Sequence, residues 1–252
     1  MINDIQEKIT AFAKELKLPY TMRHFKDDVS EANKTSKTYD AFLYDLLEKE
    51  YDIRKENGRN NRVRSARFPY KKYLEDLIIE DLPEDARNKV NVFSTLEFIE
   101  AGQNIILAGN PGVGKTHIAI GLGLKACNEG YKVLFTTIPL LVNELKESRS
   151  ERTLRAFEHR FEKYDLIIAD ELGYISFDKE ASELLFTYLS LRAGRKSTII
   201  TTNLSFERWD EIFKDPVMTA AMIDRLTHKS YIVNMNGNSY RLKETKRWLE
   251  EQ

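Results

Sequence analysis

The chain has 252 residues, of which 42% are hydrophobic and 31% are charged, and its formal net charge is −1. This length suits one substantial α/β domain with a small appendage, because domains usually hold on the order of 100–200 residues. The balance of charge excludes a global attraction to nucleic acid, so any nucleic-acid site must be a local patch.

The N-terminal region shows helical patterns. Apolar residues from Ile2 to Leu16 recur at steps of three and four, and Leu18-Pro19 ends this helix because the residue before a proline disfavours helix. After a polar stretch over 27–38, a second helix begins at Tyr39 and is expected to stop at Asn57-Gly58. We interpret 1–57 as a small all-α module. We expect no signal peptide there and no membrane span in the chain.

The composition then changes sharply. Between Arg54 and Lys72 the chain holds eight basic residues and one acid, with aromatic residues beside them, and we interpret 58–73 as a basic junction. Such a cluster suits contacts to the phosphates of DNA, while a solvated linker is the alternative. The candidate DNA contacts are Arg59, Arg62, Arg64, Arg67, Lys71 and Lys72.

From residue 74 to residue 252, short apolar segments alternate with helical patterns. Strands are predicted at 104–108, 132–136, 166–169, 198–201 and 230–234. Helices are predicted at 84–100, 114–128, 140–161 and 179–191. This alternation indicates a parallel sheet covered by helices on both faces. The only cysteine, Cys127, excludes a disulfide within the chain and favours a reducing, cytoplasmic compartment.

The strongest motif is GNPGVGKT at 109–116, which matches G-x-x-x-x-G-K-[ST] and lies between a predicted strand and a predicted helix. Glycines let backbone N–H groups approach a polyphosphate, and the helix N-terminus adds partial positive charge. We expect Lys115 to reach the β- and γ-phosphates of ATP, and the Thr116 hydroxyl to bind Mg²⁺.

A second motif ends the strand that begins at 166. Acids are costly inside a sheet, so Asp170 and Glu171 should emerge at its carboxyl end, beside the first motif. Asp170 would hold the Mg²⁺ shell, and Glu171 would activate the attacking water. The alternative is a strand that ends in solvated acids. The predicted nucleotide-binding residues are Gly109, Asn110, Pro111, Gly112, Val113, Gly114, Lys115, Thr116, His117 and Asp170.

Two further polar positions are candidates for catalysis. Asn203 follows a β-branched strand and could position the attacking water; Thr202 is a second possibility there, and an ordinary turn residue is the alternative. Arg225, in Asp-Arg-Leu, could reach the γ-phosphate of a neighbouring subunit. A surface arginine in a helical ion pair is the alternative. Other arginines that could serve are Arg192, Arg195 and Arg241.

Taken together, these motifs resemble the IstB family, ATP-binding helper proteins of insertion sequences that belong to the AAA+ class and are related to bacterial helicase loaders. The segments that carry the resemblance are GNPGVGKT at 109–116, IADELG at 168–173, ITTNL at 200–204, AMIDRL at 221–226, GNSYR at 237–241 and RSARFP at 64–69. The resemblance spans nearly the whole chain. It implies a P-loop α/β fold without the full helical lid domain of typical AAA+ proteins.

The resemblance also implies a function. We expect an ATPase that uses ATP and Mg²⁺, self-associates into a homo-oligomer on double-stranded DNA, and stimulates a cognate transposase. A replicative helicase loader remains open, because only family likeness favours the transposition helper. A P-loop small-molecule kinase is disfavoured by the Asp170-Glu171 pair, and a module that binds ATP only structurally is disfavoured by the complete set of catalytic residues.

Overall fold

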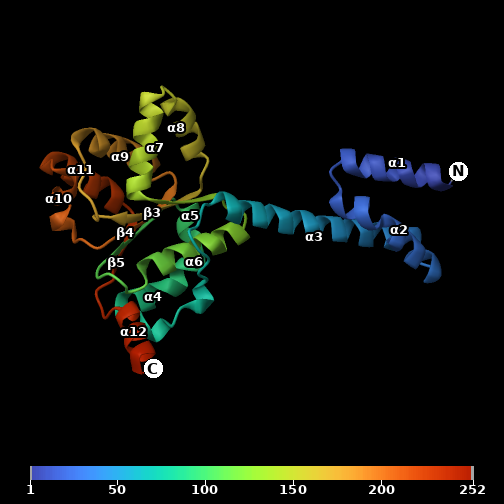
Figure 1. Cartoon of the computed structure of the whole chain (residues 1–252), viewed down its shortest axis with the longest axis horizontal. Helices are drawn as coiled ribbons and strands as arrows, with labels where there is room; N and C mark the ends of the chain where they lie inside the picture. The colour runs from blue at the N-terminus through green and yellow to red at the C-terminus, as the bar shows by residue number, and fades with distance from the viewer. Residues whose placement is uncertain (1, 251–252) are drawn as a thin grey trace. The chain divides into compact units, whose positions relative to one another are not determined.

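The computed structural model describes residues 2–250 and divides the chain into two compact units, Met1–Asn61 and Arg62–Gln252. The N-terminal unit contains α1 (Ile2–Glu15), α2 (Pro19–Lys34) and most of α3 (Tyr39–Ser65) (Figure 1). A buried polar contact joins two of its helices, because the Thr21 backbone N–H and hydroxyl both donate to Glu50 Oε2, at 2.9 and 3.1 Å.

The N-terminal region differs from the sequence predictions in two places. Helix α2 was not predicted: it begins at Pro19 and continues to Lys34, into the polar stretch over 27–38, and its buried Phe25 packs inside the unit. The predicted stop at Asn57-Gly58 is wrong, because α3 continues to Ser65. A mid-helix glycine costs only about 1 kcal/mol relative to alanine. Tertiary contacts after it outweigh that cost, since Val63 packs against the core of the second unit.

The second unit is built on a five-stranded parallel sheet in the order β2-β3-β4-β1-β5. Its strands are β1 (Asn104–Ala108), β2 (Val133–Thr137), β3 (Leu166–Leu172), β4 (Ser197–Thr202) and β5 (Ser230–Asn234). All five predicted strands are therefore confirmed, each to within a few residues at its ends. The predicted parallel sheet covered on both faces is confirmed as well.

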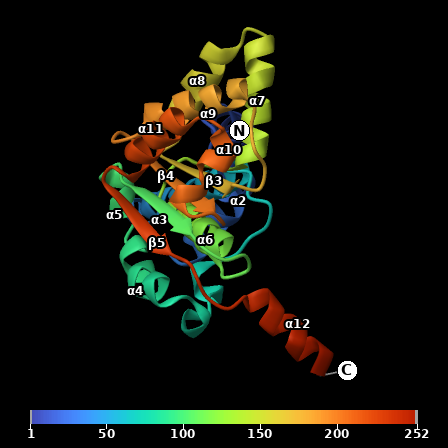
Figure 2. The same ribbon diagram turned by 90° about the vertical axis from the view of Figure 1, so that its left-hand side faces the viewer.

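Helices cover both faces of this sheet, as Figures 1 and 2 show. One face carries α4 (Glu84–Phe93), α5 (Glu97–Glu100) and α6 (Lys115–Asn128), and the other carries α7 (Ile138–Ser150), α8 (Leu154–Glu162), α9 (Lys179–Arg192), α10 (Asp210–Phe213) and α11 (Pro216–Thr227). Successive strand residues point to opposite faces. Ile105 and Leu107 accordingly enter one buried cluster while Ile106 enters the other.

Two of the predicted helices are divided in the structure. The helix expected over 84–100 breaks where Leu96 adopts a left-handed conformation with φ 65°, and the one expected over 140–161 breaks at Arg152 with φ 59°. The periodic apolar pattern continues across both breaks because each pair of helices packs on the same face of the sheet. Periodicity alone therefore cannot locate such breaks.

The segment after β5 returns to the P-loop. Met235 accepts a hydrogen bond from the Asn110 N–H at 3.1 Å, and the Tyr240 N–H donates to Gly112 O at 2.9 Å. Helix α12 (Tyr240–Glu250) follows, and Lys243 at its first turns pairs with Asp81 of the 3₁₀ turn Ile79–Asp81. Among residues 2–250, no helix is long and apolar enough to cross a membrane.

Candidate nucleotide-binding site

The P-loop connects β1 to α6 in a conformation that its glycines permit. Gly114 has φ 96°, and a Cβ on Gly109 would stand 2.2 Å from the backbone carbon of Met235. Any larger residue at Gly109 would therefore collide with the chain after β5. Lys115 is the first residue of α6 and is only 8% exposed. Its ammonium donates to the carbonyls of Gly109 and Asn110, both at 2.7 Å.

Burial changes the ionisation of the Lys115 ammonium. Desolvation lowers the pKa of Lys115 to about 8, and the positive charge of Arg241 adds to the effect while Asp170 opposes it. A polyanion bound beside a lysine of this kind stabilises the charged form of the ammonium and so raises its pKa.

The two predicted metal-binding side chains meet at the carboxyl end of β3. The Thr116 hydroxyl lies 3.0 Å from Oδ1 and 3.2 Å from Oδ2 of Asp170, whose carboxyl group is buried. Burial raises the pKa of Asp170, while its hydrogen bonds from Thr201 and Thr116 act in the opposite direction. A hydroxyl and a carboxylate are hard oxygen donors, and together they suit a Mg²⁺ ion that also binds phosphate and water. These residues therefore fit the ion.

Thr201 of β4 joins the two predicted acids in a way that the sequence did not reveal. Its hydroxyl donates to Asp170 Oδ1 and accepts the backbone N–H of Glu171 at 3.0 Å. The β3–β4 register shifts between Ala169 and Leu172, and Glu171 adopts φ 67° at this bulge. A bulge can redirect a side chain. Glu171 is accordingly exposed and lines the cavity, while Asp170 stays buried.

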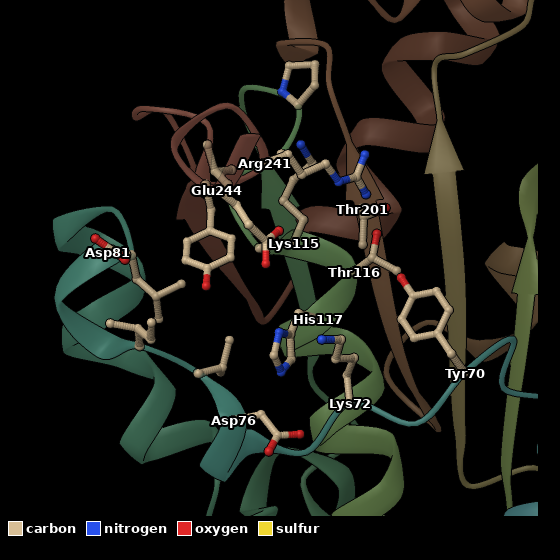
Figure 3. A pocket seen from close by; sticks show the side chains of 18 of the residues that line it. Tyr70, Lys72, Asp76, Asp81, Lys115, Thr116, His117, Thr201, Arg241 and Glu244 are labelled. Atoms are coloured by element: carbon tan, nitrogen blue, oxygen red, sulfur yellow. The ribbon is translucent and has the colours of Figure 1, made fainter. Parts of the chain in front are cut away.

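A cavity of about 340 Å³ covers the P-loop and collects most of the predicted site residues (Figure 3). Pro111 to His117 and Glu171 line it, together with Thr201 and Thr202. Asp81, Lys72, Arg241 and Glu244 add charged groups, and Leu77, Ile78, Leu82 and Tyr240 add apolar surface. Sequence reasoning did not place these groups from 70–82 and α12 at the site. No local pattern ties them to the P-loop.

Two of the predicted catalytic residues, Asn203 and Arg225, do not line this cavity. Asn203 lies next to Gly173, and its buried Oδ1 has no hydrogen-bond partner among the described residues. Arg225 places its guanidinium 5.1 Å from the centre of the Phe186 ring on α9. The geometry within one chain therefore leaves both roles as predictions, and Thr201 and Thr202 are the β4 side chains at the cavity.

The three arginines named as alternatives to Arg225 differ in their surroundings. Arg192 is 2% exposed and donates to the carbonyls of Phe161, Tyr164 and Ser197, so it joins the ends of α8, β3 and β4. A guanidinium held in this way cannot reach another subunit. Arg241 lines the cavity of its own chain. Arg195 follows α9 and is not among the residues that line the cavity.

The predicted DNA contacts also differ among themselves. Arg62 Nε donates to Cys127 O at the end of α6 at 2.8 Å, and Arg67 pairs with Glu144 at 3.3 Å. Lys72 lines the cavity. Arg59, Arg64 and Lys71 are exposed, and Arg64 has an interaction with another group. Arg62 is thus a structural residue as well as a candidate contact.

A parallel sheet with a P-loop after β1 and an acidic pair near the carboxyl end of β3 defines the class of P-loop ATP-binding proteins. Residues 11–247 match the family described as IstB-like ATP binding protein. The chain belongs to this family.

Named relatives agree with this assignment. The chain is 36% identical over 232 residues to the insertion sequence IS21 putative ATP-binding protein of Pseudomonas aeruginosa, a match that covers 92% of this chain and 88% of the relative. Its fold is similar to AMPPCP-bound DnaA from Aquifex aeolicus, with a TM-score of 0.55 and 22% identity over 73% of this chain and 56% of that one. The DnaC helicase loader gives a TM-score of 0.50 and 20% identity over 69% and 99% of the two chains.

Proposed function

We propose that this protein binds and hydrolyses ATP with Mg²⁺, and that its ATP-bound copies assemble on duplex DNA and stimulate the transposase of an insertion sequence. The observation that carries the ATPase proposal is that Lys115, Thr116 and Glu171 line one cavity, and that the Thr116 hydroxyl contacts the buried Asp170 carboxyl group behind it. The DNA and transposase steps are supported by family membership and by the local basic residues.

The residues divide the work of hydrolysis among them. The P-loop N–H groups and Lys115 bind the β- and γ-phosphates, and Thr116 and Asp170 would hold Mg²⁺, which neutralises phosphate charge when bound. Glu171, exposed at the cavity wall, accepts a proton from the attacking water. Thr201 fixes the positions of both acids by bonding the Asp170 carboxylate and the Glu171 N–H.

A site of this kind needs a positive charge opposite the γ-phosphate during hydrolysis. We propose that Arg225 of a neighbouring copy supplies it, because Arg225 lies away from its own cavity and Arg192 is tied to backbone carbonyls. A groove of about 660 Å³ opens beside the site and has room for such a side chain; four acids, Asp170, Glu171, Glu144 and Glu147, and two arginines, Arg67 and Arg241, line it. Assembly then becomes a condition for rapid turnover.

ATP affinity should depend on pH through Lys115. Its pKa is about 8 in the free protein, and bound phosphate raises that pKa, so binding above pH 8 must take up one proton. We therefore expect the contribution of Lys115 to affinity to be constant below pH 8 and to fall about tenfold per unit above it. Calorimetry in buffers of different ionisation enthalpy measures both the affinity and the proton uptake.

The matched control for this prediction is Lys115→Arg, whose guanidinium stays charged throughout the range. If that variant binds ATP, its affinity should show no such slope. A wild-type affinity that is constant up to pH 9.5, with no proton uptake, would contradict the assignment of the slope to Lys115.

DNA binding should depend on exposed cations that do not support the fold or line the cavity. Arg59 and Lys71 meet both conditions. We expect the double variant Arg59→Ala, Lys71→Ala to weaken binding to all duplexes alike and to reduce the slope of log affinity against log salt by about two. Fluorescence anisotropy on two unrelated duplexes at several salt concentrations measures both effects.

A second double variant provides the control. Lys163 and Lys246 are also exposed and lie outside the basic segment, so Lys163→Ala, Lys246→Ala should leave the salt slope nearly unchanged. Arg62→Ala is unsuitable as a test, because it also removes the bond to Cys127 O and should lower the stability of the fold. Equal losses in the two double variants would mean that general charge, and not the basic segment, binds DNA.

A further inference from the structure

Residues 66–73, which we call the strap, connect α3 to the 3₁₀ turn Leu74–Asp76, and a polar contact holds each end of the strap in place. At the first end, the Phe135 N–H of β2 donates to Ala66 O at 2.7 Å. At the second end, His117 Nε2 lies 2.8 Å from Tyr73 O. Strand β2 is an edge strand, and α6 begins at the P-loop, so the strap crosses from the edge of the sheet to the nucleotide site.

Between these ends, the strap packs against other residues of the second unit, to which it belongs. The Phe68 ring lies 6.2 Å from the Phe135 ring, and a Cβ on Gly123 of α6 would stand 2.9 Å from Phe68. Gly123 therefore leaves room for Phe68 to sit directly on the P-loop helix. These contacts attach the segment to the second unit at Ala66, Phe68 and Tyr73, while the side chains of Arg67 and of residues 69–73 remain exposed.

Tyr70 is the strap side chain that reaches the reaction end of the site. The nucleotide cavity and the neighbouring groove share four lining residues, which are Tyr70, Thr116, Glu171 and Arg241. Tyr70 thus stands on the boundary between the two spaces, beside the proposed metal ligand and the proposed general base. Figure 3 shows its hydroxyl end directed toward Thr116.

The Tyr70 side chain is 46% exposed, and its phenol is neutral at physiological pH. Burial raises the pKa of Tyr70, the carboxyl groups of Asp170 and Glu171 raise it further, and Arg241 acts in the opposite direction. A neutral phenol is a hydrogen-bond donor. At this end of a P-loop site, the acceptor that distinguishes ATP from ADP is an oxygen of the terminal phosphate.

We propose that Tyr70 senses the terminal phosphate of ATP through a hydrogen bond from its hydroxyl, and that the strap transmits this state to the adjacent cations Lys71 and Lys72. The inference rests on the proposed ATP binding. It gives the strap a defined role, because one short segment would then carry both the phosphate contact and two of the candidate DNA contacts. ATP would hold the strap in the arrangement that binds DNA, and loss of the terminal phosphate would release it.

The test compares Tyr70→Phe with Tyr73→Phe. Both remove one phenolic hydroxyl from the strap, but only Tyr70 lines the cavity. Affinities for AMPPCP and for ADP, each with Mg²⁺, are measured by calorimetry. A hydrogen bond to a charged group predicts that Tyr70→Phe lowers the preference for AMPPCP over ADP by about tenfold or more, with ADP affinity and melting temperature unchanged. Tyr73→Phe should keep the wild-type preference.

A second measurement follows the signal to DNA. Wild-type affinity for a duplex should be higher with AMPPCP than with ADP, and in Tyr70→Phe the two affinities should become equal while binding without nucleotide stays at the wild-type level. A merely structural role would not select one nucleotide state in this way.

The measurements distinguish failure of the sensor role of Tyr70, failure of transmission through the strap and failure of the proposed ATP binding. If the wild type binds AMPPCP and Tyr70→Phe keeps the full preference over ADP, the sensor role of Tyr70 is overturned and the proposed ATPase stands. If the preference falls but DNA binding still responds to AMPPCP as in the wild type, the transmission through the strap is overturned. If the wild type binds neither nucleotide, the proposed function fails first, and the inference fails with it.

Discussion

Replacing Lys115 with alanine is expected to abolish tight ATP binding. The buried ammonium makes two hydrogen bonds at 2.7 Å to P-loop carbonyls, and it would exchange them for charged phosphate oxygens when a polyphosphate binds. Charge-assisted hydrogen bonds contribute about 1.5–3 kcal/mol each, so losing two of them should weaken ATP binding on the order of a hundredfold or more. Direct titration with ATP and Mg²⁺ measures the change.

Lys125→Ala is the matched control, since Lys125 lies in the last turn of the same helix and away from the cavity. It should keep the wild-type affinity for ATP. An unchanged affinity in Lys115→Ala, in protein with a normal melting temperature, would show that the P-loop assignment is wrong.

Glu171→Gln is expected to keep ATP bound and to stop turnover. The amide preserves the shape of the side chain at the bulge but cannot accept a proton from water. General-base catalysis contributes about 10²–10⁴-fold to a rate, so steady-state hydrolysis should fall by at least a hundredfold. Binding should change little, because the polyphosphate is held by the P-loop and Lys115. Phosphate release and nucleotide titration measure the two quantities separately.

A mixing experiment tests whether the site is shared between copies. Arg225→Ala alone should also hydrolyse ATP slowly, with nearly normal ATP affinity. When it is mixed with Glu171→Gln, some interfaces pair an intact Glu171 with an intact Arg225, and part of the activity should return. Full activity in Glu171→Gln would rule out Glu171 as the base, whereas co-assembled mixtures that gain no activity would rule out a shared site.

The sequence predicted those parts of the molecule whose signals are local. The P-loop, the acids near the carboxyl end of β3 and the five strands each depend on a short run of residues, and the structure places them as expected. The break at Leu96 and the continuation of α3 past Gly58 depend on what packs against each helix, so no local pattern reports them.

Other site residues depend on the order of strands, which the chain does not state. Thr201 forms hydrogen bonds with Asp170 and Glu171 because β4 lies between β3 and β1 in the sheet, with β3 on the side of these two acids. A threonine near the end of a β-branched strand looks like ordinary strand composition. Tyr70 precedes β1 in the sequence and Arg241 follows β5, yet both line the cavity. Only long-range contacts in the folded chain bring them together.

The most direct test of the account is the mass of Glu171→Gln protein bound to duplex DNA, measured with ATP and with ADP. Because this variant should retain ATP without hydrolysing it, we expect assemblies of several copies on DNA with ATP, at physiological salt, and few or none with ADP. Adding the transposase of the same insertion sequence should then give more strand transfer with the ATP assembly than without it. DNA bound to the same extent and as single copies with either nucleotide would contradict the claim that ATP controls assembly on DNA.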